Sequence, residues 1–121
     1  MRAGVLLALL LVLAVSADAQ QRVRVTGVFS NMQYVAEAGD VIGTEVLIVA
    51  VEGGYYAVVQ IAEGSPSIPV VVPVTVNGSD VAFSVSRPFD GRFTGRVTRE
   101  ALVGHFGSER ITLKRGKSYW Q

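Results

Sequence analysis

The sequence predicts an all-β fold: a small antiparallel up-and-down barrel, or flattened barrel, of about eight short strands. Two observations carry this prediction. β-branched and aromatic residues recur in short runs that suit a pleated sheet better than a helix. Glycine, proline and asparagine stand between the runs, at the spacing of tight hairpin turns. Consecutive hairpins favour a meander in which each strand pairs with the next along the chain.

The N-terminal residues 1–19 have the pattern of a signal peptide. Arg2 supplies a positive charge, Val5 to Val15 form an unbroken apolar run, and Ala17-Asp18-Ala19 fits the cleavage rule. The apolar run is shorter than the roughly 20 residues of a membrane-spanning helix, which argues against an uncleaved anchor. We expect residues 20–121 to form a single antiparallel β-barrel domain that is periplasmic or secreted.

The 121-residue chain has no cysteine, so a hydrophobic core must stabilise the domain without disulfides. Its charge is uneven, because residues 20–86 are net acidic and residues 87–121 are net basic. The asymmetry fits an anionic partner for the C-terminal half, or attraction between the two halves of one fold. We favour the second interpretation.

The first strand is predicted over residues 22–29, and the segment after this strand has two interpretations. Residues 30–33 fit a capping box, which predicts a short helical turn over residues 31–38. Alternatively, the strand continues through Tyr34 and turns at Gly39-Asp40. The sequence does not separate these alternatives.

Residues 45–63 are the most apolar stretch, and they predict a central hairpin with its turn at Gly53-Gly54. Both faces of the first arm are apolar: Leu47, Val49 and Val51 on one side, and Val46, Ile48 and Ala50 on the other. The hairpin is therefore covered on both sides, or one of its faces meets a partner.

Residues 68–76 predict the next strand, which contains Pro69 and Pro73. The two prolines are an even number of residues apart, so their missing N–H donors lie on the same lateral side. A central strand would lose two ladder hydrogen bonds there. We expect this strand to be an edge, or a seam, on that side.

The second half predicts further strands with turns at Asn77-Gly78, Asp90-Gly91 and Gly107-Ser108. One face of these strands is polar and basic. The inward face carries large apolar residues: Phe83, Phe93, Leu102, Phe106, Ile111 and Leu113. Only Gly95 and Gly104 leave room on that face, so we expect a packed interior with at most a shallow apolar mouth.

The sequence predicts no catalytic residue, cofactor or metal site. His105 is the only histidine, it falls on the polar face, and no carboxylate stands beside it in sequence. One histidine without cysteine cannot complete a zinc site. Two carboxylate sets stay as alternatives: Glu37, Asp40 and Glu45 for calcium, and Glu45, Glu52 and Glu63 for a hydrolase.

The C-terminal segment 114–121 combines three cations with two aromatic residues. It fits an anionic surface such as lipopolysaccharide or nucleic acid, or it folds back so that Tyr119 and Trp120 plug a barrel end. We expect the second arrangement and no nucleic-acid partner. The residues available for contact with a partner are Arg92, Arg96, Arg110, Lys114, Tyr119 and Trp120.

Two resemblances add to this interpretation. Gly27-Val28-Phe29 resembles the G-x-aromatic opening of lipocalin-type and avidin-type (calycin-type) barrels, with Phe in place of Trp or Tyr. Residues 30–32, 37–40 and 113–121 are similar to small secreted proteins of Gram-negative bacteria. That similarity implies periplasmic residence and no particular activity.

The sequence therefore predicts an exported, non-enzymatic binding or interaction domain, with a small apolar ligand or an envelope protein as its partner. The alternatives are a hydrolase using strand-end carboxylates and an envelope accessory or inhibitor protein. We do not expect an integral membrane protein. The last strands expose arginines and are shorter than the about 9–11 residues of an outer-membrane strand.

The cleavage site gives a direct prediction. Protein recovered from the periplasm should begin at Gln20, with or without cyclisation to pyroglutamate, and intact-mass measurement checks this. Periplasmic protein that retains Met1 would contradict it.

Overall fold

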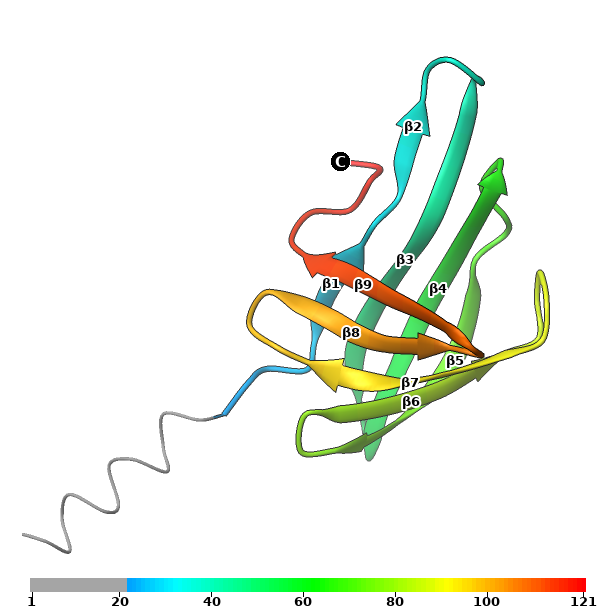
Figure 1. Cartoon of the computed structure of the whole chain (residues 1–121). Helices are drawn as coiled ribbons and strands as arrows, with labels where there is room; N and C mark the ends of the chain where they lie inside the picture. Colours follow the sequence, from blue (N-terminus) through cyan, green and yellow to red (C-terminus); the bar gives the residue numbers. More distant parts are fainter. Residues whose placement is uncertain (1–21) are drawn as a thin grey trace, which may run out of the picture.

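Residues 22–121 are described by a computed structural model, in which they form a closed barrel of antiparallel strands (Figure 1). The predicted signal peptide, residues 1–19, lies outside the described residues. No helix occurs within residues 22–121, and thus none that could cross a membrane. The prediction of an all-β up-and-down barrel is confirmed, and the architecture is consistent with calycin-like barrels.

The sheet contains β1 and β3 to β9 as a closed ring of eight strands, with β2 extending the line of β1. The strands are β1 Gly27–Ser30, β2 Gln33–Val35, β3 Asp40–Val51, β4 Gly54–Gly64, β5 Val70–Asn77, β6 Asp80–Val85, β7 Gly91–Val97, β8 Ala101–Phe106 and β9 Glu109–Arg115. Each strand from β3 onward pairs with the next, and β1 closes the ring by pairing with both β3 and β9. If the paired residues are followed from strand to strand around the ring, the path comes back to β1 at a later residue than the one it started from. This stagger is what tilts the strands of a closed barrel.

The break between β1 and β2 settles the two interpretations of residues 31–38 in favour of a strand. Across the break the Asn31 N–H donates to the Thr44 carbonyl at 3.1 Å, and Asn31 Oδ1 accepts from the Thr44 N–H at 2.7 Å. The long strand β3 thus supplies hydrogen-bond partners for the backbone and side chain of Asn31. A helical turn would have to form its hydrogen bonds between its own residues. The helical-turn alternative is therefore wrong. The strand alternative is right in its path through Tyr34, but the turn lies at residues 36–39 instead of Gly39-Asp40.

The central hairpin forms as predicted, but its turn lies one residue earlier. Val51 pairs with Gly54, so the turn residues are Glu52 and Gly53 rather than Gly53 and Gly54. Only Gly53 has positive φ, at 82°, which is the conformation that an L-residue rarely adopts. The turn needs positive φ at only one residue. The Gly-Gly pair in the sequence therefore did not show which two residues form the turn.

Large side chains fill the barrel interior. The largest fully buried side chains come from most strands of the ring: Phe29, Phe93, Ile48, Leu102, Leu113, Val46, Val59 and Val97. The Phe83 and Phe93 rings stack with their centroids 5.0 Å apart, and Phe106 meets Phe83 edge-on at 6.4 Å. Phe106 lies at the mouth, half-buried under the Phe89 ring, and is not the fully buried residue that its alternation predicts.

Gly95 and Gly104 are paired neighbours on β7 and β8, and they face inward as predicted. A Cβ on Gly95 would lie 2.4 Å from the Val103 carbonyl oxygen and 2.7 Å from the Phe93 ring. A Cβ on Gly104 would meet the same ring at 2.8 Å. The two glycines make the space that Phe93 occupies, so the aromatic core depends on them.

Arg115 closes the end of the barrel where the chain enters β1. Its guanidinium lies over the Phe29 ring at 4.6 Å from the centroid, and it donates to the backbone carbonyls of Arg24, Thr26 and Thr98. Burial and, second, the nearby charge of Arg24 lower the pKa of Arg115. The contacts tie the segment before β1 to the last strand.

The glycine pair predicts a large effect from one methyl group. Gly95→Ala should lower the free energy of unfolding by about 1–3 kcal/mol or more, since the backbone and the Phe93 ring must move to admit the Cβ. The measurement is urea unfolding. Gly54→Ala is the matched control, because no atom lies within 4 Å of the added Cβ. Equal stabilities of the two variants would contradict the close packing.

Candidate functional site

The barrel wall opens between β5 and β6. These strands pair at Thr75–Ala82, Val76–Val81 and Asn77–Asp80, whereas β5 pairs with β4 along Val70 to Val74. The first half of β5 and the end of β6 therefore separate. The predicted seam beside the proline-containing strand is confirmed.

Pro73 accounts for the point where the pairing ends. Asn77 and Asp80 flank a two-residue turn, so they form a hydrogen-bonded pair, and such pairs recur at every second residue. Thr75 with Ala82 is the next pair, and Pro73 with Ser84 would come after it. Pro73 has no N–H to donate. The ladder stops one step before the position where the donor is missing.

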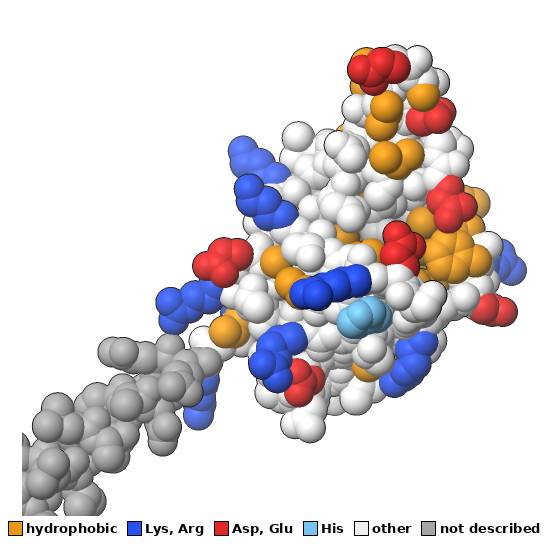
Figure 2. Space-filling model, viewed as in Figure 1, with side chains coloured by type: hydrophobic (Ala, Val, Ile, Leu, Met, Phe, Trp, Pro, Cys, Tyr) orange, Lys and Arg blue, Asp and Glu red, His pale blue; other side chains and the backbone are white. Residues whose placement is uncertain are grey.

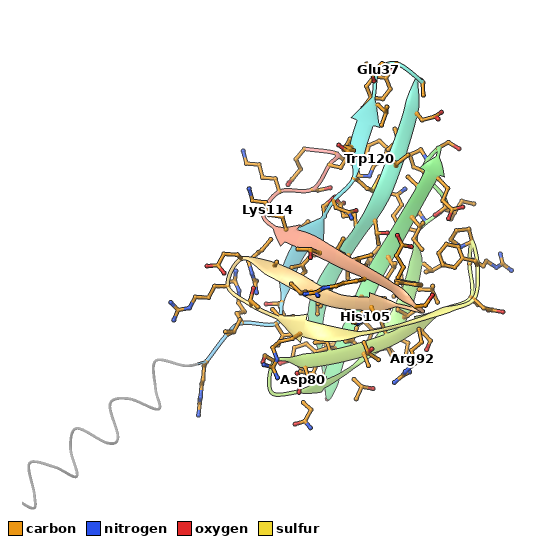
Figure 3. All side chains as sticks on the ribbon, in the orientation of Figure 1. Glu37, Asp80, Arg92, His105, Lys114 and Trp120 are labelled. Atoms are coloured by element: carbon orange, nitrogen blue, oxygen red, sulfur yellow. The ribbon has the colours of Figure 1, made fainter. Side chains whose placement is uncertain are left out.

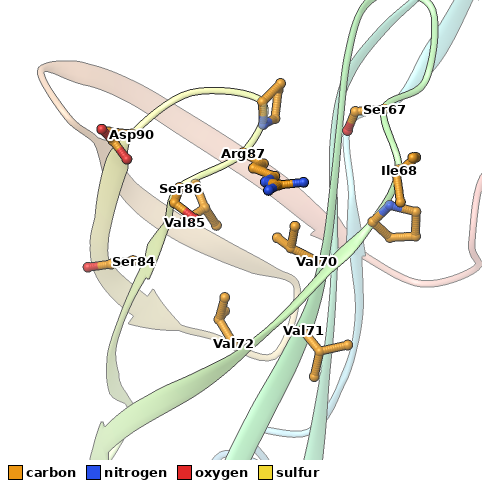
Figure 4. A pocket seen from close by; sticks show the side chains of 12 residues that line it. Ser67, Ile68, Val70, Val71, Val72, Ser84, Val85, Ser86, Arg87 and Asp90 are labelled. Atoms are coloured by element: carbon orange, nitrogen blue, oxygen red, sulfur yellow. The ribbon is translucent and has the colours of Figure 1, made fainter.

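The separated strands enclose a groove of about 790 Å³ (Figure 4). Its lining residues come from both sides of the seam: Ser67, Ile68, Pro69, Val70, Val71, Val72, Ser84, Val85, Ser86, Arg87, Pro88 and Asp90. Val70, Val72 and Val85 have the inward orientation and give the groove an apolar floor. This volume lies within the range of small-molecule and cofactor sites, about 300–1,000 Å³.

Unpaired backbone groups line both edges of the groove. The alternation places the N–H and C=O of Val71 on the β6 side of β5, and those of Ser84 on the β5 side of β6. Ser86 follows directly after the end of β6 and lines the same groove. Above the Thr75–Ala82 pair, no described residue of one strand pairs with the other. The groove thus combines an apolar floor with two rows of hydrogen-bonding groups.

The rim of the groove carries charge and a fixed loop. Arg87 and Asp90 line it, and neither forms an ion pair with another residue of the described chain. At the opposite side Ser67 is held to β4, where its N–H donates to the Ile61 carbonyl at 2.9 Å and its carbonyl accepts from Gln60 Nε2 at 2.9 Å. The β5 wall of the groove therefore begins from an anchored position.

The C-terminal segment folds back, but onto the barrel wall instead of a barrel end. Glu45 on β3 accepts hydrogen bonds from the Ser118 hydroxyl and the Tyr119 N–H, both at 2.6 Å. The Trp120 indole N–H donates to Gln60 Oε1 on β4 at 2.8 Å. The Gly116 N–H donates to the Val28 carbonyl of β1 at 3.0 Å, and the tail then runs beside β1 and β2 (Figures 1 and 3). The predicted plug is therefore wrong, because outward-facing polar groups on β3 and β4 hold the tail.

The residues predicted for partner contact do not form one surface. Arg92, Arg96, Arg110 and Lys114 lie on the outer face of β7, β8 and β9 with His105, where charges of both signs are scattered (Figures 2 and 3). Arg96 pairs with Asp80 at 3.1 Å, and Arg92 donates to Ser84 Oγ at 3.3 Å. Tyr119 and Trp120 lie with the tail on another part of the wall. Their role in partner contact stays a prediction.

A second apolar surface lies on the outer wall of β3, β4 and β5. Its residues alternate outward and stand opposite one another in the sheet: Leu47, Val49, Val51, Tyr56, Val58, Val71 and Pro73. Leu47, Tyr56 and Val71 are exposed by 36%, 40% and 66%, which leaves this part of the two-faced hairpin uncovered. Val71 belongs both to this wall and to the groove.

The carboxylate sets considered for a hydrolase or a calcium site are not assembled. Glu52 lies in the β3–β4 turn, whereas Glu63 pairs with Ile42 near the opposite end of the hairpin. Glu45 holds the C-terminal tail. Among the residues that the structure describes, no three His, Asp or Glu side chains are grouped as metal ligands.

Sequence reasoning found one side of the groove and missed the other. Pro69 and Pro73 indicated the open edge of β5, but nothing in the sequence showed which residues lie across the gap. Ser84, Ser86, Arg87 and Asp90 take that position through the barrel register.

Comparison with protein-family models, with curated proteins and with solved structures finds no match for this chain.

The tail contacts predict a measurable release. Glu45→Ala removes both 2.6 Å hydrogen bonds, so the segment carrying Trp120, the only tryptophan, should become mobile. Fluorescence anisotropy of the tryptophan should fall, while Glu63→Ala, a carboxylate outside the tail contacts, should leave it unchanged. An unchanged anisotropy in Glu45→Ala would show that these bonds do not hold the tail.

Proposed function

We propose that this protein is an exported, non-enzymatic binding domain whose binding site is the groove between β5 and β6. The single observation that carries the proposal is the opening of the wall in a barrel whose interior is full. A ligand carrier with a central site needs space inside the ring. Here Phe29, Phe93 and Leu102 have no exposed surface, and they occupy that space.

The groove has the composition of a binding site. Its floor is apolar, while polar backbone groups and two charged side chains stand around it. In binding sites the apolar lining usually supplies affinity, and the few polar groups fix the orientation of the ligand. His105 is exposed and stands beside Thr94 and Arg110 in the sheet, without a neighbouring carboxylate to position it as a base. These features support binding rather than catalysis.

Export is the second part of the proposal. It rests on Arg2, the apolar run from Val5 to Val15 and the Ala17-Asp18-Ala19 sequence. The absence of cysteine is compatible with an oxidising compartment, because no thiol is exposed to mispairing. We place the protein in the periplasm or outside the cell.

An apolar dye tests the site. N-phenyl-1-naphthylamine, which is neutral and fluoresces in apolar surroundings, should bind the groove weakly. Ile68→Asp should weaken this binding by about tenfold, because it puts a carboxylate on the apolar lining. Ile68 is 88% exposed, so the substitution should leave the fold intact.

Val51→Asp provides the matched control. Val51 is an exposed apolar residue of the outer wall, at the far end of β3 from the groove. Dye binding that falls in Ile68→Asp and persists in Val51→Asp supports the groove as the site. Equal binding by Ile68→Asp and the parent protein would overturn the proposal.

A further inference from the structure

We propose that the groove binds an extended segment of a partner protein, which adds as a strand to the open edge of β6. This inference rests on the proposed binding function of the groove and names its occupant. The occupant is identified by three features of the seam: free backbone groups, an alternating arrangement of side chains, and an exposed apolar wall beside it.

The backbone groups favour β6 as the pairing edge. Within β6, Ser84 presents its N–H and C=O toward the gap, and Ser86 lines the same groove just past the end of the strand. The facing edge of β5 is poorer, since Pro69 and Pro73 lack donors and only Val71 offers an N–H. An added strand therefore pairs with β6, and β5 contributes mainly side-chain contacts.

The side chains around the gap specify the pattern of the segment. An added strand points alternate residues to the two faces of the sheet. Its inward residues meet Val70, Val72 and Val85, whereas its outward residues lie among Ser84 and Ser86. The preferred segment alternates apolar and polar residues. At the rim, Arg87 can form an ion pair with an acidic residue of the segment, and Asp90 can form one with a basic residue.

A small apolar molecule fits the same groove less well. It would cover the N–H and C=O groups of Ser84 without giving them partners. A buried polar group left without a hydrogen bond keeps the full cost of its desolvation, which weakens binding. An extended polypeptide supplies those partners in the geometry of a sheet.

The outer wall favours a protein over a free peptide. Val71 and Ile68 border the groove and are 66% and 88% exposed, and Val71 continues into Tyr56 and Pro73 on the wall. Contiguous exposed apolar surface of this kind marks protein–protein contact. A folded partner that donates a strand has the surface to cover it.

The test uses a defined peptide pool and the full mature chain. The pool contains seven-residue peptides with Val, Ile, Leu or Phe at positions 2, 4 and 6 and Ser, Thr, Lys or Glu elsewhere. Two further pools have the same side chains, with N-methyl groups at the odd or at the even positions. Affinity selection with mass-spectrometric detection, and then displacement of N-phenyl-1-naphthylamine, identifies peptides that occupy the groove.

Pairing with one edge predicts an asymmetric result. The parent peptides should be retained and should displace the dye, and one of the two N-methylated pools should bind at least tenfold more weakly than the other. N-methylation removes donors from one edge of a strand without changing its side chains. Equal binding by all three pools would overturn strand addition.

Variants at Ser84 test the same contact from the protein side. Ser84→Pro removes the N–H that faces the gap and keeps the pairs of Phe83 and Val85 with β7. It should weaken peptide binding at least tenfold, whereas Ser84→Ala, which keeps the N–H, should bind like the parent. Equal peptide binding by the two variants would contradict the proposal.

The outcomes separate this inference from the proposed function. Dye that binds the groove and is displaced by no peptide would overturn strand addition and leave a groove for small apolar ligands. Dye binding insensitive to Ile68→Asp, with no peptide retained, would overturn both.

Discussion

The missing N–H of Pro73 is the constraint on which the candidate site depends. A closed barrel satisfies its strand edges by pairing every strand on both sides. The β5–β6 ladder stops at Thr75–Ala82, one step before Pro73 would have to donate to Ser84. The Ser84 carbonyl therefore loses its donor, and beyond this point no described residue of β5 pairs with β6. The rest of the ring remains paired, so the fold tolerates the opening.

The filled interior gives this opening its functional meaning. Gly95 and Gly104 allow the Phe93 ring to lie inside the barrel, where it stacks with Phe83. Arg115 and the segment before β1 close one end, and Phe89 over Phe106 narrows the other. A core of this kind stabilises a domain without disulfides, and it leaves the barrel centre unavailable to a ligand. Binding is thereby directed to the side wall.

The sequence predicted the fold class well because strand alternation is a local signal. The inward faces of β5 to β9, the glycine pair and the seam all derive from period-two patterns and proline chemistry. Features that depend on register were not predictable in this way. They include the turn at Glu52-Gly53, the strand path through Asn31 and the docking of the tail on Glu45. Only the β5 side of the groove could be predicted, because Pro69 and Pro73 are local signals in the sequence. The residues that face it, Ser84 to Asp90, are brought there by the way the barrel closes.

Amide hydrogen exchange across the seam tests the central claim most directly. In the unliganded protein, the amides of Val71 and Ser84 should exchange rapidly, because their N–H groups face the open gap. The adjacent amides of Val72, Phe83 and Val85 bond to β4 or β7, so they serve as internal references and should exchange slowly. If Val71 and Ser84 were as protected as these neighbours, β5 and β6 would be paired along their length, and the groove would not exist.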